Sequence, residues 1–502
     1  MNRTHGVRSA LWITFAAVAA TFAVVAACAR SVDPEASDFG DASVDVGSDA
    51  GTDGPPALGT VSDGSLNECV NLQCRQKVCP GGGKTTVSGF VWDPARLNPL
   101  YNVVVYVPNA PLGPLARGVT PGAPCSCDAL YSGQPIATAL TDAKGHFVLE
   151  NVPVGSDVPL VVQIGKWRRQ FTIGPVEACK DNPQPYDRFT LPKNKDEGDI
   201  PNIAVSTGSA DSLECLLRRI GLDPKEFVAG EGTPEGGHVH VFRGDEHDGG
   251  ILAEEIPDTV PSAPKSRDAL WTSSASLMKY DIVLLSCEGR PTEDTKPAFL
   301  AEYTSAGGRV FAEHYHHAWL RSGAPFDTAN VATWSDSDGG DAYRDPIEAT
   351  IVTTLPDGNP FPRGVAMNEW MKSVNGLLGG KLRIKEARHN ALVGAANPVS
   401  QSWIVADDAA APPSTQYFSF DMPLDAGLDE RGLSKVCGRV VFSDLHVGAD
   451  ARDYESSVGK VVPSGCSSRD LSGTEKALEF MLFDLSSCVE PVSSAPKPPP
   501  IR

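Results

Sequence analysis

Residues 280–319 constrain the fold of this chain more than any other segment. The segment contains two apolar runs, 281–285 and 309–312, and the helix-like stretch between them ends at the pair Gly307 and Gly308. A continuous apolar run is typical of a strand that is covered on both faces, as in a parallel sheet. A glycine pair is typical of the end of a helix. The segment therefore predicts two neighbouring strand–helix units of a parallel sheet.

Side chains that can do chemistry follow both of these predicted strands. Cys287 and Glu288 come after the first strand, and His314, His316 and His317 come after the second. The carboxyl ends of the strands form the ligand crevice of an open α/β sheet, so we expect Cys287, Glu288 and His314 to lie there. His316 and His317 are consecutive and point in different directions, so at most one of them joins a site with His314.

The N-terminus predicts export and lipidation. Two arginines precede an apolar run at 11–27, which is too short for an ordinary membrane span. The run ends in Val-Ala-Ala-Cys28, which resembles a bacterial lipobox, and this implies a signal peptide at 1–28 with Cys28 as the lipidated first residue. Ordinary cleavage and an uncleaved anchor are the alternatives. Several acyl chains would hold the protein stably on a membrane, and Ala29 favours the outer membrane or cell surface over the inner membrane.

Two acidic segments and a terminal tail are expected to lie outside the folded domains or in loops. Residues 29–65 are rich in Asp, Ser, Gly and Ala and contain little apolar area to bury, which predicts a disordered acidic tether. Calcium binding is the alternative for this segment. Residues 336–345 resemble a calcium loop, but their acidic spacing misses the EF-hand pattern. Residues 491–502 form a Pro-rich tail.

The charge of the chain excludes one class of partner. The formal net charge is -20 and the basic residues form no long run. Nucleic acids and anionic membrane surfaces attract basic proteins, so we expect no nucleic-acid partner, and membrane contact only through the lipid anchor.

Export also places the cysteines in an oxidising compartment. Eleven cysteines follow Cys28, and an odd number leaves at least one outside the disulfides. Cys287 is the candidate, because a thiol in a cleft has a use. The first domain has six candidates for disulfides, enough for three bridges: Cys69, Cys74, Cys79, Cys125, Cys127 and Cys179. Two more, Cys466 and Cys488, flank the last helix, and a bridge between them would clamp it. No pairing is predicted for Cys215 or Cys437.

Residues 66–192 have the pattern of an all-β domain. Apolar residues alternate near its start, and a turn is expected at 142–145 inside a hairpin. The motifs SGFVWD at 88–93, TDAKGHF at 141–147 and NVPVG at 151–155 resemble the carboxypeptidase regulatory-like, or transthyretin-like, β-sandwich family. That resemblance implies a seven-stranded sandwich that serves as a structural or binding module, although the Cys125-Ser126-Cys127 insertion departs from the family pattern.

Residues 200–490 alternate between strand and helix patterns. The fold class we predict is therefore multi-domain, with an all-β sandwich followed by an α/β flavodoxin-like parallel-sheet domain with insertions. Asp211 is expected to cap the first helix, with Glu214 completing a capping box. Ser472 and Glu475 form the same motif before the last helix, at 474–486.

Three segments of this second domain resemble, in order, the class I glutamine amidotransferase-like superfamily and its ThuA-like group. They are YDIVLLSCEG at 280–289, EYTSAGGRVFAEHYHHAW at 302–319 and GRVVFSDLHV at 438–447. The resemblance implies a nucleophile elbow after the second of these strands and a late histidine, here His446, after the third. Amidotransferases need a cysteine at the elbow, and this elbow carries His314, so glutaminase chemistry is not expected.

The resemblance brings Cys287, Glu288, His314 and His446 to one crevice. Two histidines with a carboxylate or a thiolate suit zinc or another transition ion, and we name His314, His446 and Glu288 as candidate ligands. One alternative is that the histidines are hydrogen-bonded core residues and Cys287 is buried. Another is a nucleophile–base pair of Cys287 and His446, for which no third, orienting group is evident.

Two functions follow from these features. The favoured one is a cell-envelope lipoprotein that binds or scaffolds without catalysis, lacks the amidotransferase nucleophile, and has a glycan or an envelope protein as its partner, by analogy alone. The alternative is an envelope hydrolase or metal-dependent enzyme that uses the crevice of Cys287, Glu288, His314 and His446.

Overall fold

The computed structural model describes residues 69–501, except for 122–124, 126, 209–210, 232–235, 245–266, 289–290, 292–296, 336–345, 407–408, 410–411, 429, 431–433, 448–465 and 467. One compact unit spans Asn67–Arg502. The predicted lipobox at Cys28, the tether at 29–65 and the acidic segment at 336–345 lie outside the described residues.

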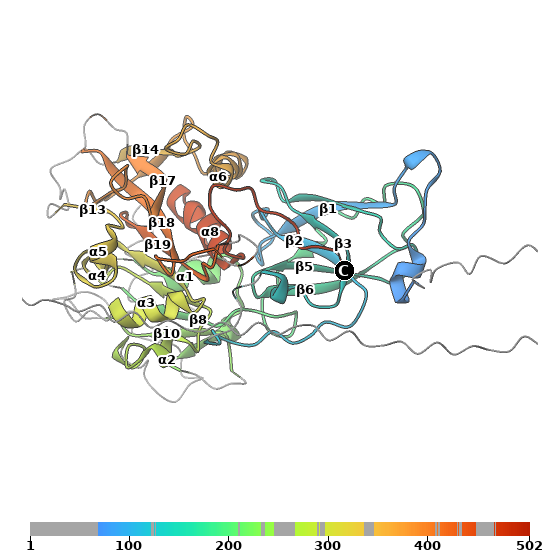
Figure 1. Cartoon of the computed structure of the whole chain (residues 1–502), viewed down its shortest axis with the longest axis horizontal. Helices are drawn as coiled ribbons and strands as arrows, with labels where there is room; N and C mark the ends of the chain where they lie inside the picture. Colours follow the sequence, from blue (N-terminus) through green and yellow to red (C-terminus); the bar gives the residue numbers. More distant parts are fainter. Residues whose placement is uncertain are drawn as a thin grey trace, which may run out of the picture. The chain divides into compact units, whose positions relative to one another are not determined.

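The amino-terminal part of this unit contains two small sheets (Figure 1). Their strands are β1 (Thr86–Trp92), β2 (Val104–Pro108), β3 (Pro135–Leu140), β4 (His146–Glu150), β5 (Val158–Ile164), β6 (Trp167–Ile173) and β7 (Phe189–Thr190). One sheet has the order β4-β1-β7 and the other has the order β3-β2-β5-β6. Burial alternates along β1, as the alternating sequence predicts. We call these two sheets the sandwich.

The hairpin predicted around residues 142–145 is wrong in one respect. The turn is present: the Asp142 carboxylate accepts hydrogen bonds from the backbone N–H groups of Lys144 and His146, and Gly145 has a φ of +74°. However, β3 pairs with β2 while β4 pairs with β1, so the turn carries the chain from one sheet to the other. Turn chemistry is local, whereas the pairing of each flanking strand depends on partners elsewhere in the chain.

A mixed ten-stranded sheet forms the rest of the unit, in the order β15-β14-β17-β18-β19-β12-β11-β8-β10-β9. Its strands are β8 (Ile203–Ser206), β9 (Phe227–Ala229), β10 (Val239–Phe242), β11 (Ile282–Leu285), β12 (Arg309–Glu313), β14 (Ile347–Ile351), β15 (Leu382–Ile384), β17 (Ser400–Ala406), β18 (Ser414–Met422) and β19 (Gly438–Ser443). The pairs from β9 to β19 are parallel, and those from β19 to β15 are antiparallel. The structure thus confirms a sheet-rich fold of mixed type.

Most of the remaining elements are short. The strands β13 (Thr333–Trp334) and β16 (Ala391–Leu392) pair with each other. The α-helices are α1 (Leu213–Arg219), α2 (Ser274–Leu277), α3 (Pro297–Ser305), α4 (His317–Ser322), α5 (Phe326–Ala329), α6 (Pro362–Ser373) and α8 (Gly473–Ser486). The 3-10 helices are η1 (Asn71–Arg75), η2 (Pro80–Gly82), η3 (Cys127–Leu130), η4 (Pro224–Glu226), η5 (Arg267–Ala269) and η6 (His314–His316). The longer elements are the helices α6 and α8. The longest helix, α8, begins at the predicted capping box of Ser472 and Glu475.

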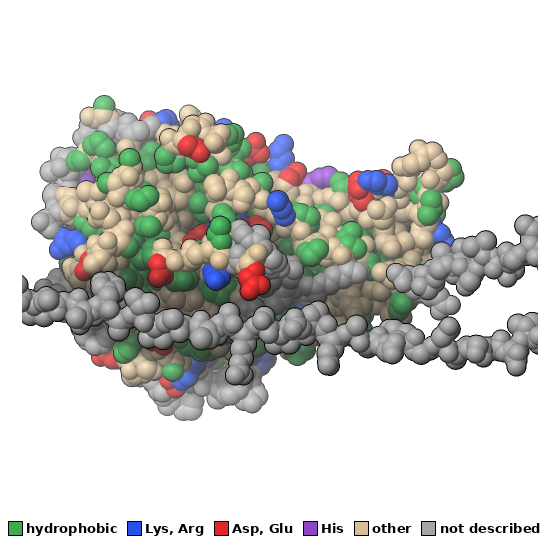
Figure 2. All heavy atoms as spheres, in the orientation of Figure 1, with side chains coloured by type: hydrophobic (Ala, Val, Ile, Leu, Met, Phe, Trp, Pro, Cys, Tyr) green, Lys and Arg blue, Asp and Glu red, His purple; other side chains and the backbone are tan. Residues whose placement is uncertain are grey.

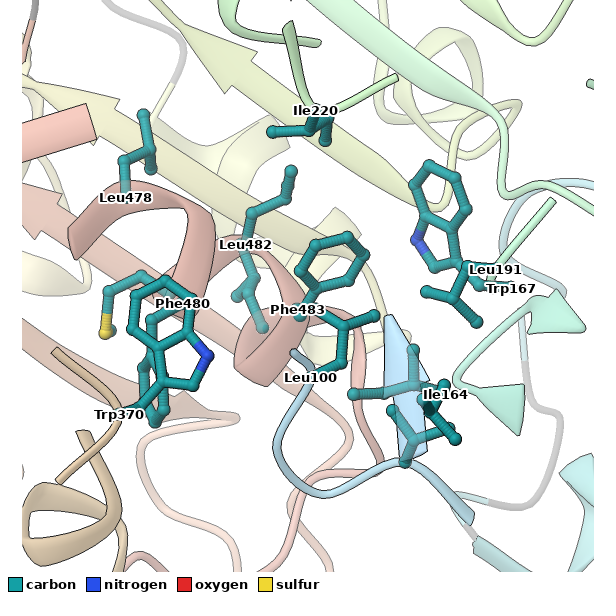
Figure 3. Close-up of a cluster of buried hydrophobic side chains, with 14 of the residues drawn as sticks. Leu100, Ile164, Trp167, Leu191, Ile220, Trp370, Leu478, Phe480, Leu482 and Phe483 are labelled. Carbon is teal, nitrogen blue, oxygen red and sulfur yellow. The ribbon is translucent and has the colours of Figure 1, made fainter. Parts of the chain in front are cut away.

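The helix α8 packs against side chains from both parts of the unit. Figure 3 shows its Phe480, Leu482 and Phe483 among residues of the sandwich, of α6 and of the segment after α1. The Phe483 ring lies 5.8 Å from Trp167 of β6, and the Phe480 ring lies 5.6 Å from Trp370 of α6. One apolar cluster therefore includes both parts, and the boundary predicted at residues 192–200 falls inside one compact unit.

The disulfides differ from the predicted pairing. The described residues contain five bridges: Cys69–Cys74, Cys79–Cys179, Cys125–Cys437, Cys127–Cys488 and Cys215–Cys466. The prediction of three bridges inside 66–192 is wrong, and so is the predicted clamp between Cys466 and Cys488. Sequence spacing cannot determine connectivity, because the fold decides which segments meet. Cys287 forms none of these bridges, as predicted.

On the face that Figure 2 shows, the acidic and basic side chains of the described residues are interspersed with other residues. Within the described residues, no helix has both the length and the apolar composition that crossing a membrane requires.

Candidate metal centre

Three neighbouring strands bring Cys287, His314 and His446 together. The strands β11, β12 and β19 are consecutive and parallel in the large sheet, and the three residues follow their carboxyl ends. One ligand atom from each residue lies within 4.8 Å of the others. The Cys287 Sγ lies 3.3 Å from His314 Nδ1, and the rings of His314 and His446 are 5.0 Å apart. The carboxyl edge of the parallel strands therefore holds a compact group of one thiol and two imidazoles.

These side chains are buried. The exposed fraction is 0% for Cys287 and His314, 3% for His446 and 1% for Glu288. The group therefore lies in the protein interior and not along an exposed cleft. Burial, and after it the charges of His446 and Arg388, lowers the pKa of His314 well below its usual value. Its imidazole is neutral at physiological pH, which is the form that binds metals.

His314 has an unusual backbone and one unsatisfied nitrogen. Its φ is +35°, in a region that side chains with a Cβ rarely adopt, at the junction of β12 and η6. Its Nδ1 faces Cys287, and its Nε2 is buried without a hydrogen-bond partner among the described residues. A buried polar atom without a partner costs about 1–3 kcal/mol. A ligand at Nε2 would remove that cost.

His446 is oriented by a carboxylate that the sequence did not point to. Its Nδ1 lies 2.9 Å from Asp211 Oδ2, and Arg388 donates to its Nε2 at 3.3 Å. The prediction that Asp211 caps α1 is wrong: Ser212 is the N-cap, and it makes no side-chain cap hydrogen bond. A carboxylate on one ring nitrogen fixes the tautomer and leaves the other nitrogen for a metal or a donor.

Two glutamates flank the group in different ways. The Glu313 carboxyl accepts a hydrogen bond from the backbone N–H of Cys287 at 3.1 Å. Burial, and after it the charge of Asp211, raises the pKa of Glu313 well above its usual range. Glu288 instead accepts a hydrogen bond from the Ser206 hydroxyl of β8 at 3.4 Å.

The predicted ligand set of His314, His446 and Glu288 therefore needs a correction. Among the described residues, Cys287 and not Glu288 joins the two histidines. The physical reason is that consecutive residues of an extended chain point to opposite sides. Cys287 faces β12, whereas Glu288 faces β8.

His316 and His317 do not belong to the group. Their Nδ1 atoms lie 3.0 Å from the backbone carbonyls of Glu313 and His314, respectively, and their rings pack against Trp319 and Trp334. These contacts agree with the expectation that at most one of them joins His314.

The donor set fits a transition ion better than any other ligand. A thiol and two imidazoles are ligands of zinc and copper, whereas magnesium and calcium require oxygen donors. One feature opposes binding, since Arg388 places a cation at His446 Nε2. The sequence did not indicate Asp211 or Arg388 as site residues, because they lie 235 and 58 residues from His446 in the chain and no local motif links them to it.

Comparisons with known proteins add no family. No protein-family model matches the chain, and no curated protein matches it. Among solved structures, 23% of this chain is similar to 18% of a 9R-lipoxygenase from Cyanothece PCC8801, with 14% identity and a TM-score of 0.15. In addition, 31% of this chain is similar to 88% of a chain from a type II cohesin-X-dockerin complex of Acetivibrio cellulolyticus, with 14% identity and a TM-score of 0.15. At these TM-scores neither match bears on the fold or the function.

Proposed function

We propose that the chain is a cell-envelope lipoprotein whose folded part binds one transition-metal ion, of the zinc type, through Cys287, His314 and His446. The observation that carries this proposal is the convergence of their three ligand atoms within 4.8 Å in the protein interior. Three protein ligands would leave one tetrahedral position, which a buried water molecule could occupy. A metal held in this way acts as a Lewis acid.

Two further contacts support a metal centre. The 3.3 Å between Cys287 Sγ and His314 Nδ1 is close to the separation of two ligand atoms that share one zinc ion. Asp211 holds His446 by Nδ1, in the carboxylate–histidine arrangement that orients metal ligands. An ion at His446 Nε2 would have to displace the Arg388 guanidinium, so Arg388 weakens binding.

The competing hypothesis of a nucleophilic thiol has less support. In a catalytic triad one histidine contacts both the nucleophile and the orienting acid. Here His314 contacts Cys287, while Asp211 contacts His446. The parts of a triad are thus divided between two histidines, and Cys287 is fully buried.

The central strands support the finer fold assignment that we propose for 200–490. When β9 and the inserted strands β14 to β18 are left out, the order β10-β8-β11-β12-β19 is the second, first, third, fourth and fifth strand along the chain. This is the order of flavodoxin-like sheets. We propose the same fold for this part, as its resemblance to the ThuA-like group implies, with β14 to β18 as part of the insertions.

The remaining parts of the proposal concern location and partners. The sandwich serves as a non-catalytic module that binds a glycan or an envelope protein, and lipidation of Cys28 anchors the chain to the outer membrane or cell surface. The support for these statements is the pattern of residues 1–28 and the resemblance of 66–192 to the carboxypeptidase regulatory-like family.

Metal analysis of the purified full-length chain tests the site. We expect about one zinc ion per wild-type chain after dialysis against zinc, and less than a tenth of that in Cys287→Ser, His314→Ala and His446→Ala, because each variant removes one of three ligands. His146→Ala is the matched control, since His146 lies on β4 in the sandwich, outside the group. It should bind as the wild type does.

Two neighbouring variants sharpen the test. Asp211→Asn should weaken zinc binding about 10–100-fold in a chelator competition, because it removes the orienting carboxylate. Arg388→Met should strengthen binding, because it removes the competing cation. A wild-type chain that stays free of metal, or a control that loses metal as the ligand variants do, would refute the proposal.

A further inference from the structure

A second potential site lies at the amino ends of the parallel strands of the large sheet, opposite the carboxyl ends that carry the candidate metal centre. A cavity of about 340 Å³ borders Asp281, which precedes β11, and Arg309, which begins β12. The metal-ligand candidates Cys287 and His314 follow the other ends of these two strands. Four or five residues of strand separate the two edges, roughly 15 Å at 3.3 Å per residue. The cavity is therefore distinct from the candidate metal centre.

The walls of the cavity are mainly apolar. Its apolar side chains come from the loop before η3, from β11 and from the segments beside β19 and after α8; they include Leu115, Val119, Ile282, Val436 and Val489. A cavity of 300–1,000 Å³ with apolar walls and few polar groups is typical of a small-molecule site.

Three charged side chains line the same cavity. Lys166 forms an ion pair with Asp281, with 2.5 Å between Nζ and Oδ1, and donates to the carbonyls of Ala116 and Gly118. Arg309 donates to the backbone carbonyls of Gly307, Cys437 and Leu485. Among the described residues, no carboxylate lies within ion-pair distance of Arg309. The cavity wall thus carries two cations and one anion.

The Arg309 guanidinium has one terminal nitrogen left to donate to an anionic partner. Its bonds to carbonyls use Nε and one terminal nitrogen, Nη1. The other terminal nitrogen, Nη2, makes no hydrogen bond with the described residues. Burial, and after it the charge of Arg439, lowers the pKa of Arg309 to about 10, so the guanidinium remains charged at neutral pH but is poorly compensated. A negative charge in the cavity would correct this imbalance.

We propose that this cavity binds an aliphatic monocarboxylate, with its carboxylate at Arg309 and its tail along the apolar wall. A single negative charge matches the excess of one cation. A dianion such as a phosphate monoester would meet Asp281 and the three carbonyls around Arg309, so it fits less well. The apolar wall takes up the tail, which gains about 0.8 kcal/mol for each buried CH₂ group.

The walls of the cavity are held in place before a ligand arrives. The bridge Cys125–Cys437 joins the loop before η3 to the segment before β19, and the bridge Cys127–Cys488 joins η3 to the segment after α8. Cys125, Cys437 and Cys488 themselves line the cavity. Such preorganised walls lower the entropy that binding costs.

Calorimetric titration of the full-length chain with octanoate tests the proposal. We expect one saturable site, with octanol of the same chain length binding at least tenfold more weakly because it lacks the charge. Arg309→Gln should weaken octanoate at least tenfold and leave octanol unchanged, because only the charged head meets Arg309. Arg96→Gln, which removes a surface arginine of the sandwich, is the matched control and should bind as the wild type does.

A second variant covers the case that Arg309→Gln does not fold. Val436→Trp should fill the cavity and abolish binding of both probes, while its melting temperature shows whether the fold persists. No octanoate binding to the wild type, or full binding to a folded Val436→Trp chain, would overturn the proposal. So would equal affinities for octanoate and octanol.

Discussion

At the scale of single residues, His314 combines a strained backbone with an unsatisfied buried nitrogen. Its φ of +35° disfavours any residue with a Cβ, and its Nε2 is buried without a described partner. Strain of this kind persists only where the surroundings determine the conformation. The position at the end of β12 directs the imidazole toward Cys287, which lies 3.3 Å away. The strained backbone is therefore part of what assembles the group.

Replacement of His314 by glycine and by alanine separates backbone strain from the loss of the imidazole. Both variants lose the ring, but only glycine adopts a positive φ without a steric cost. We expect His314→Gly to be more stable than His314→Ala by about 1 kcal/mol, as measured by urea denaturation of the metal-free proteins. Ala312→Gly is the control: Ala312 lies inside the strand β12, where glycine gains nothing from its backbone freedom, so this change should destabilise the protein by about 1 kcal/mol. An alanine variant at 314 that is as stable as the glycine variant would contradict the role of strain.

The sequence predicted some members of this site and missed others. Cys287, His314 and His446 follow apolar strands, and parallel strands place their carboxyl ends together, so local patterns were sufficient to name them. Asp211 and Arg388 follow no such rule. Asp211 resembled a helix cap, and only the folded chain places it 2.9 Å from His446.

At the scale of elements, α8 illustrates the same limit. Its start was predicted because a capping box is a local signal, and Ser472 and Glu475 form both of its hydrogen bonds. Its partner surface was not predicted. Glu479 lies on the face of α8 toward the sandwich, is fully buried and accepts a hydrogen bond from Asn98 at 2.7 Å. An amphipathic pattern predicts apolar residues on the buried face of a helix, so it does not predict a buried glutamate there.

The pair of Glu479 and Asp93 should make the contact of α8 sensitive to pH. Burial raises the pKa of Asp93 to about 6 and that of Glu479 well above its usual range, the latter also because of the Asp93 charge. Raised pKa values favour the protonated groups in the folded state. Their stabilising contribution is therefore complete below about pH 4 and is lost as the pH rises through 6.

The variant Glu479→Gln should remove most of this dependence, because the amide does not titrate and places no negative charge beside Asp93. We expect the stability of the variant relative to the wild type to rise by roughly 1–3 kcal/mol between pH 5 and pH 8, as measured by urea denaturation at each pH. Glu369→Gln, at an exposed position of α6, is the control and should show no such change. Parallel pH profiles for the wild type and Glu479→Gln would contradict a contribution of Glu479 to the pH dependence.

At the scale of the whole molecule, connections between distant segments determine the architecture. The strands themselves were largely predicted from alternation and apolar runs, which are local properties. The pairing of Cys125 with Cys437 and of Cys127 with Cys488 spans 312 and 361 residues, and spacing alone offered no reason to choose these partners. The same bridges join the sandwich to the large sheet, where an apolar cluster is already shared.

The two long bridges should act together on stability. While Cys125–Cys437 is intact, the bridge Cys127–Cys488 closes only a short ring through residues 125–127 and 437–488. Removing it by Cys127→Ala with Cys488→Ala should cost about 4 kcal/mol of the free energy of unfolding, by loop-closure entropy. The control pair Cys69→Ala with Cys74→Ala opens a separation of only 5 residues and should cost about 2 kcal/mol.

Removal of both long bridges should cost more than twice the loss from either one. Once neither remains, the denatured chain gains the freedom of a second, larger ring of about 120 residues, which runs through 125–215 and 437–466 and is closed by the intact bridge Cys215–Cys466; no single removal releases it. Urea denaturation of the two double variants and the quadruple variant would measure this excess, provided that the free energy of unfolding depends on urea concentration with the same slope in all three. Strictly additive losses would mean that the bridges stabilise separate regions, and that the sandwich and the large sheet unfold independently.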